Sequence, residues 1–238
     1  MEFPRSRQSR ETVDTLRTHV IDAVMRVLQV PRNRIFTKTH EPKAWGQEQY
    51  ERVAHASTIV TVRENDLNFE CNLSDFLDTG LFLDHRNTRA RVKREAKGKR
   101  FLNLFAYTGA FSVHAIAGGA TSSTTVDLSK QYCDWAARNF KLNQFATSAQ
   151  HQIVCADVLS WLESALTKTP GTFDLIVIDP PSFSTSKKME RRFDVQKDHR
   201  RLLEMSYELM APDGAIYFST NFLQFKLDES LRPAEELT

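Results

Sequence analysis

Residues 173–183 read FDLIVIDPPSF, and this stretch decides the fold. Its first six residues form an almost unbroken apolar run that is too short for a helix, which is typical of a central parallel strand buried on both faces. Pairing must stop after Asp179, because neither Pro180 nor Pro181 has an N–H to donate. We therefore expect Asp179 at the carboxyl edge of a sheet, where open α/β sheets bind ligands.

An aromatic side chain, Phe183, follows the two prolines. Its position after a strand that ends at an acid favours stacking on a flat ligand. The alternative is a proline-rich turn whose phenylalanine packs into the core, since short motifs of this kind are not specific by themselves.

The chain from residue 101 onward alternates between strand and helix patterns. This alternation predicts a parallel, doubly wound sheet, which is an α/β fold of the Rossmann-like type. The predicted strands are 101–105, 124–126, 152–155, 173–178 and 215–219, and the predicted helices are 109–117, 129–143, 158–167 and 196–210.

The first 100 residues have a different pattern. A polar terminus precedes an amphipathic helix over 11–30, which Pro31 stops. A short strand at Ile35–Thr37 and a hairpin with strands at 58–62 and 67–73 predict a small β-rich part. A basic helix over 86–98 follows. We predict three parts, namely 1–33 (tail and helix), 34–85 (β-rich subdomain) and 86–238 (Rossmann-like domain).

Composition places the chain among soluble globular proteins, with 41% hydrophobic and 26% charged residues. No apolar run approaches the roughly 20 residues that span a membrane, and no secretory signal is visible. The three cysteines are far apart and lack C-x-x-C spacing, which argues against a disulfide framework or a metal site and for a reducing cytosol. We expect a cytoplasmic protein with no membrane partner.

Positive charge is concentrated in two places although the net charge is only +2. Residues 86–100 hold eight Lys or Arg and one acid, and residues 187–201 hold seven basic residues and three acids. Such clusters can form an electrostatic footprint for nucleic acid. The alternative is a solvated helix face.

Four predicted strand ends carry side chains suited to one ligand. The first leads into residues 106–110, AYTGA, where Gly109 allows close approach to the backbone at a helix start. Asp127 can accept both ribose hydroxyls of an adenine nucleoside, Asp157 can meet an adenine amino group, and Asp179 follows. Only one glycine stands where a dinucleotide fingerprint needs three, so S-adenosylmethionine is favoured over NAD. Each acid alone could instead be a helix N-cap.

Six motifs can be read along the chain, namely LDTGLFLDHR (77–86), FLNLFAYTGA (101–110), TTVDLS (124–129), IDPPSFS (178–184), SKKME (186–190) and FDVQKDH (193–199). Together they resemble the K domain of the bacterial bifunctional 23S rRNA guanine methyltransferase K/L family. The resemblance implies a class I S-adenosylmethionine-dependent methyltransferase fold, with the N7 position of a guanine in 23S rRNA as methyl acceptor. Sequence resembling the family's L domain is absent, which implies a stand-alone K enzyme and leaves room for a separate partner with the L activity.

The sequence departs from the family pattern near its end. Residues 220–224, TNFLQ, stand where the family has two asparagines and a basic tripeptide, so an expected basic RNA contact is missing. The family also continues past the equivalent of Thr238 into a final β-hairpin, without which a sheet edge would be exposed. The family's RNA-binding module is absent as well.

By this resemblance, Phe183 is expected to stack on the target base, while Asp179 and the carbonyl groups at Pro180 hold its amino edge. Asp84 and Arg86 are expected over the methionine end of the cofactor, although Arg86 could equally form a surface ion pair. Lys187, Lys188, Arg191 and Arg192 are expected to contact phosphates, and His85 and His199 receive no role. The predicted cofactor residues are Asp84, Arg86, Asn103, Phe105, Tyr107, Thr108, Gly109, Asp127, Leu128, Asp157, Val158 and Asp179.

Other functions remain open on the same scaffold. One is an rRNA methyltransferase acting on cytosine C5 or guanine N2, although C5 chemistry commonly uses a cysteine and none lies in 179–183. Another is a non-catalytic RNA-binding or assembly protein. A nicotinamide-dependent dehydrogenase fits least well.

Overall fold

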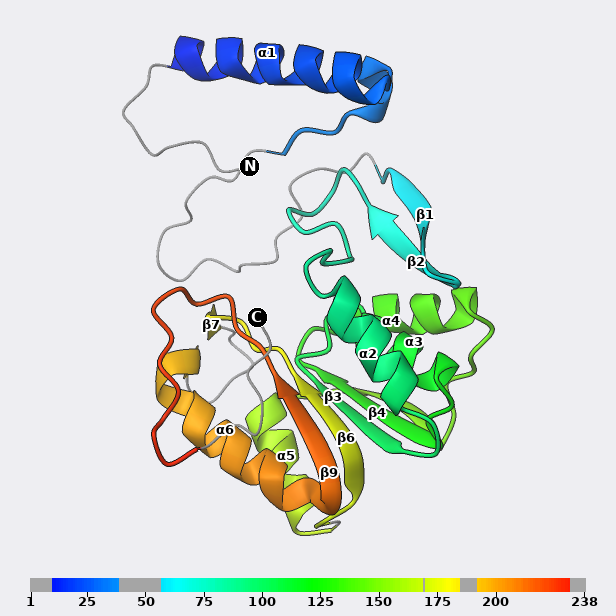
Figure 1. Cartoon of the computed structure of the whole chain (residues 1–238), viewed down its shortest axis with the longest axis vertical. Helices are drawn as coiled ribbons and strands as arrows, with labels where there is room; N and C mark the ends of the chain where they lie inside the picture. The colour runs from blue at the N-terminus through cyan, green and yellow to red at the C-terminus, as the bar shows by residue number, and fades with distance from the viewer. Residues whose placement is uncertain (1–9, 39–56, 169, 185–191, 232–238) are drawn as a thin grey trace. The chain divides into compact units, whose positions relative to one another are not determined.

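The computed structural model describes residues 10–38, 57–168, 170–184 and 192–231 (Figure 1). It divides into two compact units, Met1–Glu41 and Pro42–Thr238. The first contains helix α1 (Arg10–Leu28) and a 3-10 turn, η1 (Arg32–Arg34). The predicted strand at Ile35–Thr37 is wrong. Ile35 has an extended backbone, but its N–H closes η1 by donating to Arg32 O at 3.1 Å, and no described strand pairs with it.

The second unit is built on a five-stranded parallel sheet, which confirms the predicted Rossmann-like fold. The strand order is β5-β4-β3-β6-β9. The chain moves outward from β3 in one direction and then crosses back to β6, so the strand order reverses between β3 and β6, where such sheets bind ligands. The strands are β3 (Arg100–Leu104), β4 (Ser122–Asp127), β5 (His151–Cys155), β6 (Phe173–Ile178) and β9 (Met210–Phe218).

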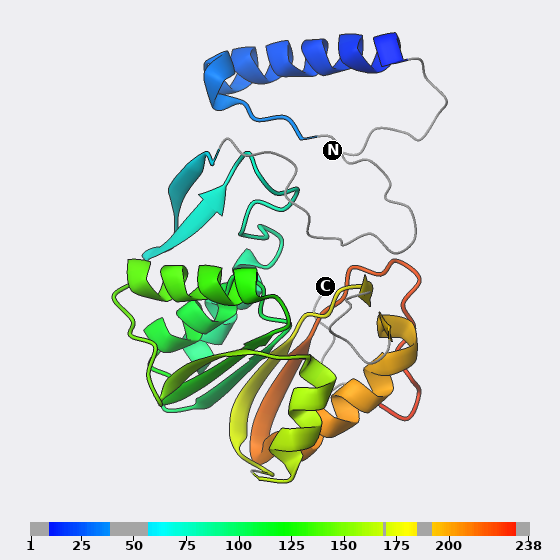
Figure 2. The ribbon, with the colours of Figure 1, turned by 180° about the vertical axis from the view of Figure 1, so that it is seen from behind.

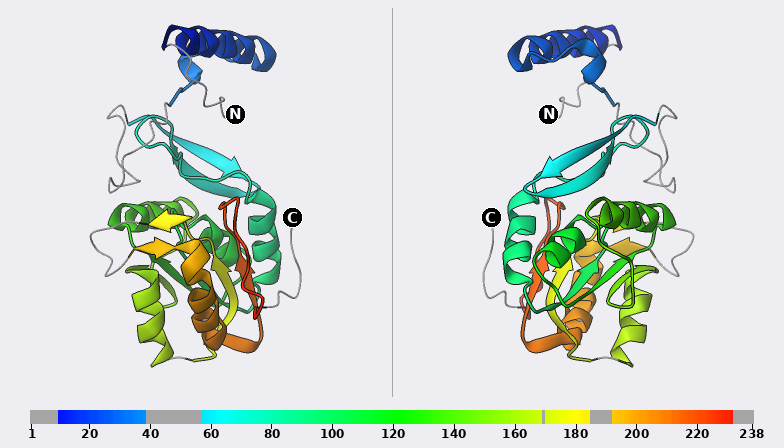
Figure 3. Two further views of the ribbon diagram at one scale, coloured as in Figure 1. Left: turned by 90° about the vertical axis from the view of Figure 1, so that its left-hand side faces the viewer. Right: turned by 90° about the vertical axis from the view of Figure 1, so that its right-hand side faces the viewer.

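Helices cover both faces of this sheet, because the strand residues alternate between two apolar cores. Leu102, Leu104 and Ile176 pack with α5 (Val158–Leu166) and α6 (Val195–Leu209), which lie side by side in Figure 2. Phe101, Leu175 and Val177 pack on the opposite face with α2 (Arg86–Glu95) and α3 (Ala110–Ala117). The side views of Figure 3 show α2 and α5 on opposite sides of the strands.

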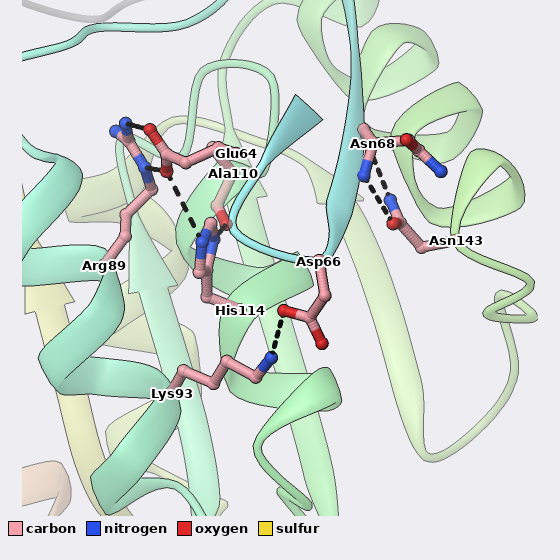
Figure 4. A network of polar contacts seen from close by, with 8 residues as sticks. All are labelled: Glu64, Asp66, Asn68, Arg89, Lys93, Ala110, His114 and Asn143. Carbon is pink, nitrogen blue, oxygen red and sulfur yellow. Dashed lines mark hydrogen bonds and ion pairs between the residues drawn. The ribbon is translucent and has the colours of Figure 1, made fainter. Parts of the chain in front are cut away.

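The predicted hairpin is present as β1 (Ile59–Glu64) and β2 (Leu67–Asn72), joined by a turn in which Asn65 has a φ of 56°. Its buried face packs on α3 and on α4 (Lys130–Leu142). The amide of Asn143 exchanges two hydrogen bonds with the backbone of Asn68, at 2.8 and 2.7 Å (Figure 4). The hairpin thus lies in the same compact unit as the sheet, while the three-part division predicted above remains a prediction.

The last strand begins earlier than its sequence predicts. β9 starts at Met210 and includes the Pro212-Asp213-Gly214 turn, because Met210 pairs with Phe173 before the register shifts and Ala215 pairs with Leu175. The other predicted elements lie within a few residues of their observed bounds. None of the described helices is long and apolar enough to cross a membrane.

Candidate active site

The loop after β3 has an unusual backbone. Phe105, Tyr107 and Gly109 all have positive φ values, at 56°, 52° and 71°. This conformation costs a non-glycine residue roughly 1–3 kcal/mol and persists only where the surroundings hold it. Here the N–H of Ala106 donates to Val126 O at 3.0 Å and that of Tyr107 donates to Asp127 Oδ2 at 2.8 Å. The end of β4 therefore fixes the shape of the loop.

Gly109 ends this loop and caps α3. A Cβ atom at Gly109 would lie 2.8 Å from the Cβ of Ala136 on α4, closer than such atoms approach in proteins. The glycine therefore meets both a conformational and a packing requirement, and it lets α3 begin close to the sheet edge. The first N–H groups of α3 point toward this edge, as at any helix N-terminus.

Asp127 ends β4 and is the acid best placed for a nucleoside. Its two oxygens accept N–H groups from Tyr107 and Ser129, both at 2.8 Å. A carboxylate can accept about four hydrogen bonds, so capacity remains for two ribose hydroxyls. Burial raises the pKa of Asp127 from 3.8 to about 6. The acceptor oxygens of Asp127 thus fit the ribose of the adenosyl ligand that the sequence predicts.

The side chains of three other predicted cofactor residues make hydrogen bonds within the chain. Asp157 caps α5 by accepting from Ser160 N at 3.0 Å, so its N-cap role is observed. Asn103 donates to Ser112 Oγ at 3.0 Å inside the core, and Thr108 donates to Gly80 O at 2.7 Å. The first bond joins β3 to α3, and the second joins the loop to Gly80.

The remaining cofactor predictions lie near the same sheet edge or within the core. Asp84 and Arg86 are exposed at the start of α2, and Leu128 is half-buried directly after Asp127. Val158 is buried in the core, and Phe105 contacts the Phe193 ring at 5.2 Å between centroids. Binding by this group remains a prediction.

Asp179 lies at the end of β6, and each of its carboxylate oxygens has one polar contact. Ser219, which follows β9, donates its hydroxyl to Oδ1 at 2.6 Å. His85, the N-cap residue of α2, lies with Nε2 3.3 Å from Oδ2. The pKa of His85 is raised, chiefly by its hydrogen bond with Asp179. His85 is the site residue that sequence reasoning missed, because spacing cannot reveal a contact between α2 and β6.

The segment after β9 forms one wall beside the Asp-Pro-Pro loop. Ser182 donates its hydroxyl to Asn221 Oδ1 at 2.7 Å, and the Phe183 and Phe222 rings meet edge to face at 5.6 Å. Phe183 is 37% exposed, and the guanidinium of Arg192 lies 5.2 Å from its ring centroid. Its ring is therefore accessible for stacking, which favours the base-binding interpretation over a core role.

The first basic cluster has a largely structural role. Arg89 is buried against Glu64, Arg91 pairs with Glu95, Lys93 pairs with Asp66, and Arg100 pairs with Asp174. These four cations are partly neutralised within the chain, which weakens the predicted footprint on α2. Of the phosphate contacts predicted in the second cluster, Lys187, Lys188 and Arg191 lie outside the described residues.

The cysteines show no catalytic arrangement. Cys71 and Cys133 are buried, and Cys155 is exposed at the end of β5. Burial raises the pKa of Cys133 to about 12, so its thiol is a poor nucleophile at neutral pH. In the part of the chain that the structure describes, no group of three or more His, Cys, Asp or Glu could hold a metal ion.

Comparisons with known proteins agree with this geometry. A family model described as S-adenosylmethionine-dependent methyltransferase matches residues 43–237. The ribosomal RNA large subunit methyltransferase K/L of Pseudomonas aeruginosa is 49% identical over 219 residues, which are 91% of this chain and 29% of that protein. The K/L protein of Pseudomonas fluorescens is 50% identical over 209 residues, 88% of this chain and 27% of its own. The resemblance stated from the motifs is thereby confirmed.

A solved structure shows the same fold. SMU.776, described as a methyltransferase and crystallised with SAH, superposes with a TM-score of 0.70 at 32% identity, over 88% of this chain and 53% of its own. The present chain spans less than a third of the length of the two K/L relatives. The fold, the loop at the sheet edge and the match over most of the sequence lead to one conclusion. The chain belongs to the family of S-adenosylmethionine-dependent methyltransferases.

Proposed function

We propose that this protein methylates a base of large-subunit ribosomal RNA, most consistently the N7 atom of a guanine in 23S rRNA or its precursor particle. One observation carries the proposal. The loop over 105–109 and Asp127 lie at the same sheet edge as Asp179 and the exposed Phe183, so cofactor and base would meet there. The names of the K/L relatives supply the substrate class.

When bound, S-adenosylmethionine supplies an electrophilic methyl group. Guanine N7 has an in-plane lone pair and carries no proton, so its methylation needs no general base. The task of the chain is to hold the nitrogen in line at near-attack distance. Phe183 stacks on the base, while Asp179 and the carbonyl groups at Pro180 accept hydrogen bonds from its amino edge. The base must be unpaired or extruded to reach this edge of the sheet.

A second acceptor, the exocyclic N2 amine of guanine, is favoured by the pairing of Asp179 with His85. Methylation of an amine releases a proton, and a carboxylate beside an imidazole can receive it. Cytosine C5 is less consistent, because the only exposed cysteine, Cys155, lies at the end of β5 rather than in the Asp-Pro-Pro loop. We also propose that a separate protein supplies the L-type activity.

The proposal is tested by transfer of labelled methyl from S-adenosylmethionine to undermodified 23S rRNA, followed by nucleoside identification. We expect label in 7-methylguanosine. Label in N2-methylguanosine would move the acceptor to the amine, and label in 5-methylcytidine would contradict both. Absence of label with intact cofactor binding would require the test to be repeated on precursor particles. Absence of both would favour a non-catalytic RNA-binding protein.

The Asp179→Ala variant tests the role assigned to this carboxylate. It should abolish transfer, because the base loses the acceptor that orients it, while cofactor affinity stays within about threefold of wild type if Asp179 serves only the acceptor. Loss of cofactor binding in this variant would place Asp179 in the cofactor site or the fold instead.

A further inference from the structure

His85 is held rigidly beside Asp179. Its carbonyl accepts the N–H of Arg89 at 2.8 Å as the first turn of α2 begins, and its ring meets the edge of Phe111 at 5.6 Å. The helix is itself anchored, because Arg89 forms two hydrogen bonds with Glu64, at 2.7 and 2.8 Å (Figure 4). The imidazole is therefore held in two ways. It packs against Phe111 of α3, and the helix that it caps is anchored by the buried Arg89–Glu64 pair.

Asp179 is held on both of its oxygens by groups from two distant parts of the chain. Ser219 donates to Oδ1 from beyond β9, and His85 Nε2 faces Oδ2 from α2. Contacts on both oxygens restrict rotation of the carboxylate about its Cβ–Cγ bond, so the remaining lone pairs keep a fixed orientation. This is how residues that position a catalytic group usually act.

The charges around His85 favour its protonated form. Asp179 has the largest effect and Asp84 adds to it, whereas burial and the charge of Arg89 oppose it, and the outcome is a raised pKa. The charged contact between His85 and Asp179 is therefore favoured below the ordinary pKa of histidine and weakens as the pH rises through the raised value.

We propose that His85 is a positioning residue that holds the Asp179 carboxylate in the orientation needed to receive the acceptor base. The inference rests on the proposed function for the identity of the acceptor, but not for the His85–Asp179 pair itself. Because Nε2 is turned toward Asp179, His85 acts through the carboxylate rather than on the base.

Two substitutions distinguish this role from a merely structural one. The amide nitrogen of glutamine can occupy the position of Nε2, whereas that of asparagine corresponds to Nδ1. His85→Asn should lower kcat for rRNA methylation by about tenfold to a hundredfold, because a small misplacement of a catalytic group costs that much. His85→Gln should restore most of this loss. Both variants should keep the wild-type Kd for S-adenosylmethionine, and His151→Gln, at the start of β5, serves as the control for losing a histidine.

The pH profile adds a second readout. In wild type, kcat should fall as the pH rises through the raised pKa of His85, and in His85→Gln that limb should be absent. Equal activity of the asparagine and glutamine variants, or an unchanged pH profile, would overturn the proposal.

A measurement without RNA separates this inference from the proposed function. NMR titration of the His85 ring, assigned by its absence in His85→Gln, should show a lower pKa in Asp179→Asn than in wild type. If the two titrations coincide, the pair does not exist and the inference is wrong whatever the substrate. If they differ while no RNA is methylated, the pair stands and only the proposed substrate fails.

Discussion

The Asp127 carboxylate is the residue at which cofactor binding and pH should be coupled. Burial raises its pKa to about 6, above the ordinary 3.8, so the ionised form that accepts ribose hydroxyls is lost as the pH falls through about 6. Cofactor affinity should therefore be greatest above this value and weaken below it. Calorimetric titration with S-adenosylmethionine between about pH 5 and pH 8 measures this effect directly.

Asp127→Asn should remove that dependence and weaken binding about tenfold or more at neutral pH, the cost of losing a hydrogen bond to a charged acceptor. Asp134→Asn, which changes an exposed acid on α4, is the control and should behave as wild type. An affinity that is flat with pH in the wild-type protein would contradict the assignment of Asp127 to the ribose.

Individual site residues could be predicted from the sequence where a strand end fixes their place. Asp127 and Asp179 follow apolar or β-branched runs, and parallel strands bring such ends to one edge. His85 could not be predicted in this way, because it reaches the site through the packing of α2 on α3. The internal hydrogen bonds of Asn103 and Thr108 were equally hidden, since sequence does not show which way a buried polar side chain points.

At the scale of elements, the buried Glu64–Arg89 pair joins the β1–β2 hairpin to α2. Their side chains are only 5% and 2% exposed. His114 on α3 lies 3.4 Å from Glu64, and burial lowers its pKa to about 4, so it remains neutral there. The hairpin and α2 are thus joined by one cation and one anion that are removed from water.

Glu64→Gln should lower the free energy of unfolding by about 3–5 kcal/mol, because it leaves the Arg89 cation buried without its partner. Replacing both residues with methionine should restore most of that loss, since two apolar side chains need no counter-charge. Urea unfolding of Glu64→Met, Arg89→Met and the double methionine variant measures the coupling. Lys130→Met, which breaks an exposed pair with Asp134, should change little. A loss in the double variant equal to the sum of the two single losses would show that the pair is not coupled.

Regular elements were largely predictable because hydrophobic periodicity is a local property. The strand run over 173–178 was predicted with its observed bounds, and the helix predicted over 129–143 includes all of α4. Ile35–Thr37 failed because a β-branched run forms a strand only with a partner. The early start of β9 was missed because pairing with Phe173 overrides a proline-containing turn.

At the scale of the whole molecule, every described residue of the candidate site lies in the unit Pro42–Thr238, which the family match also covers almost completely. A protein beginning at Pro42 should therefore bind S-adenosylmethionine with the affinity of the full chain. Calorimetry on both proteins, with circular dichroism to compare their folding, provides the test. A clear loss of affinity in a folded fragment would show that residues 1–41 contribute to the site.

The order of strands in the sheet has a consequence for how the protein is made. Asp127 ends β4 and is therefore made before Ser219, which follows β9. Because chains begin to fold from the N-terminal end during synthesis, the nucleoside-binding half can form while the half that receives the RNA base is still being translated. The nascent chain would then gain affinity for S-adenosylmethionine before it gains the ability to modify RNA, because β9 and Ser219 are synthesised later.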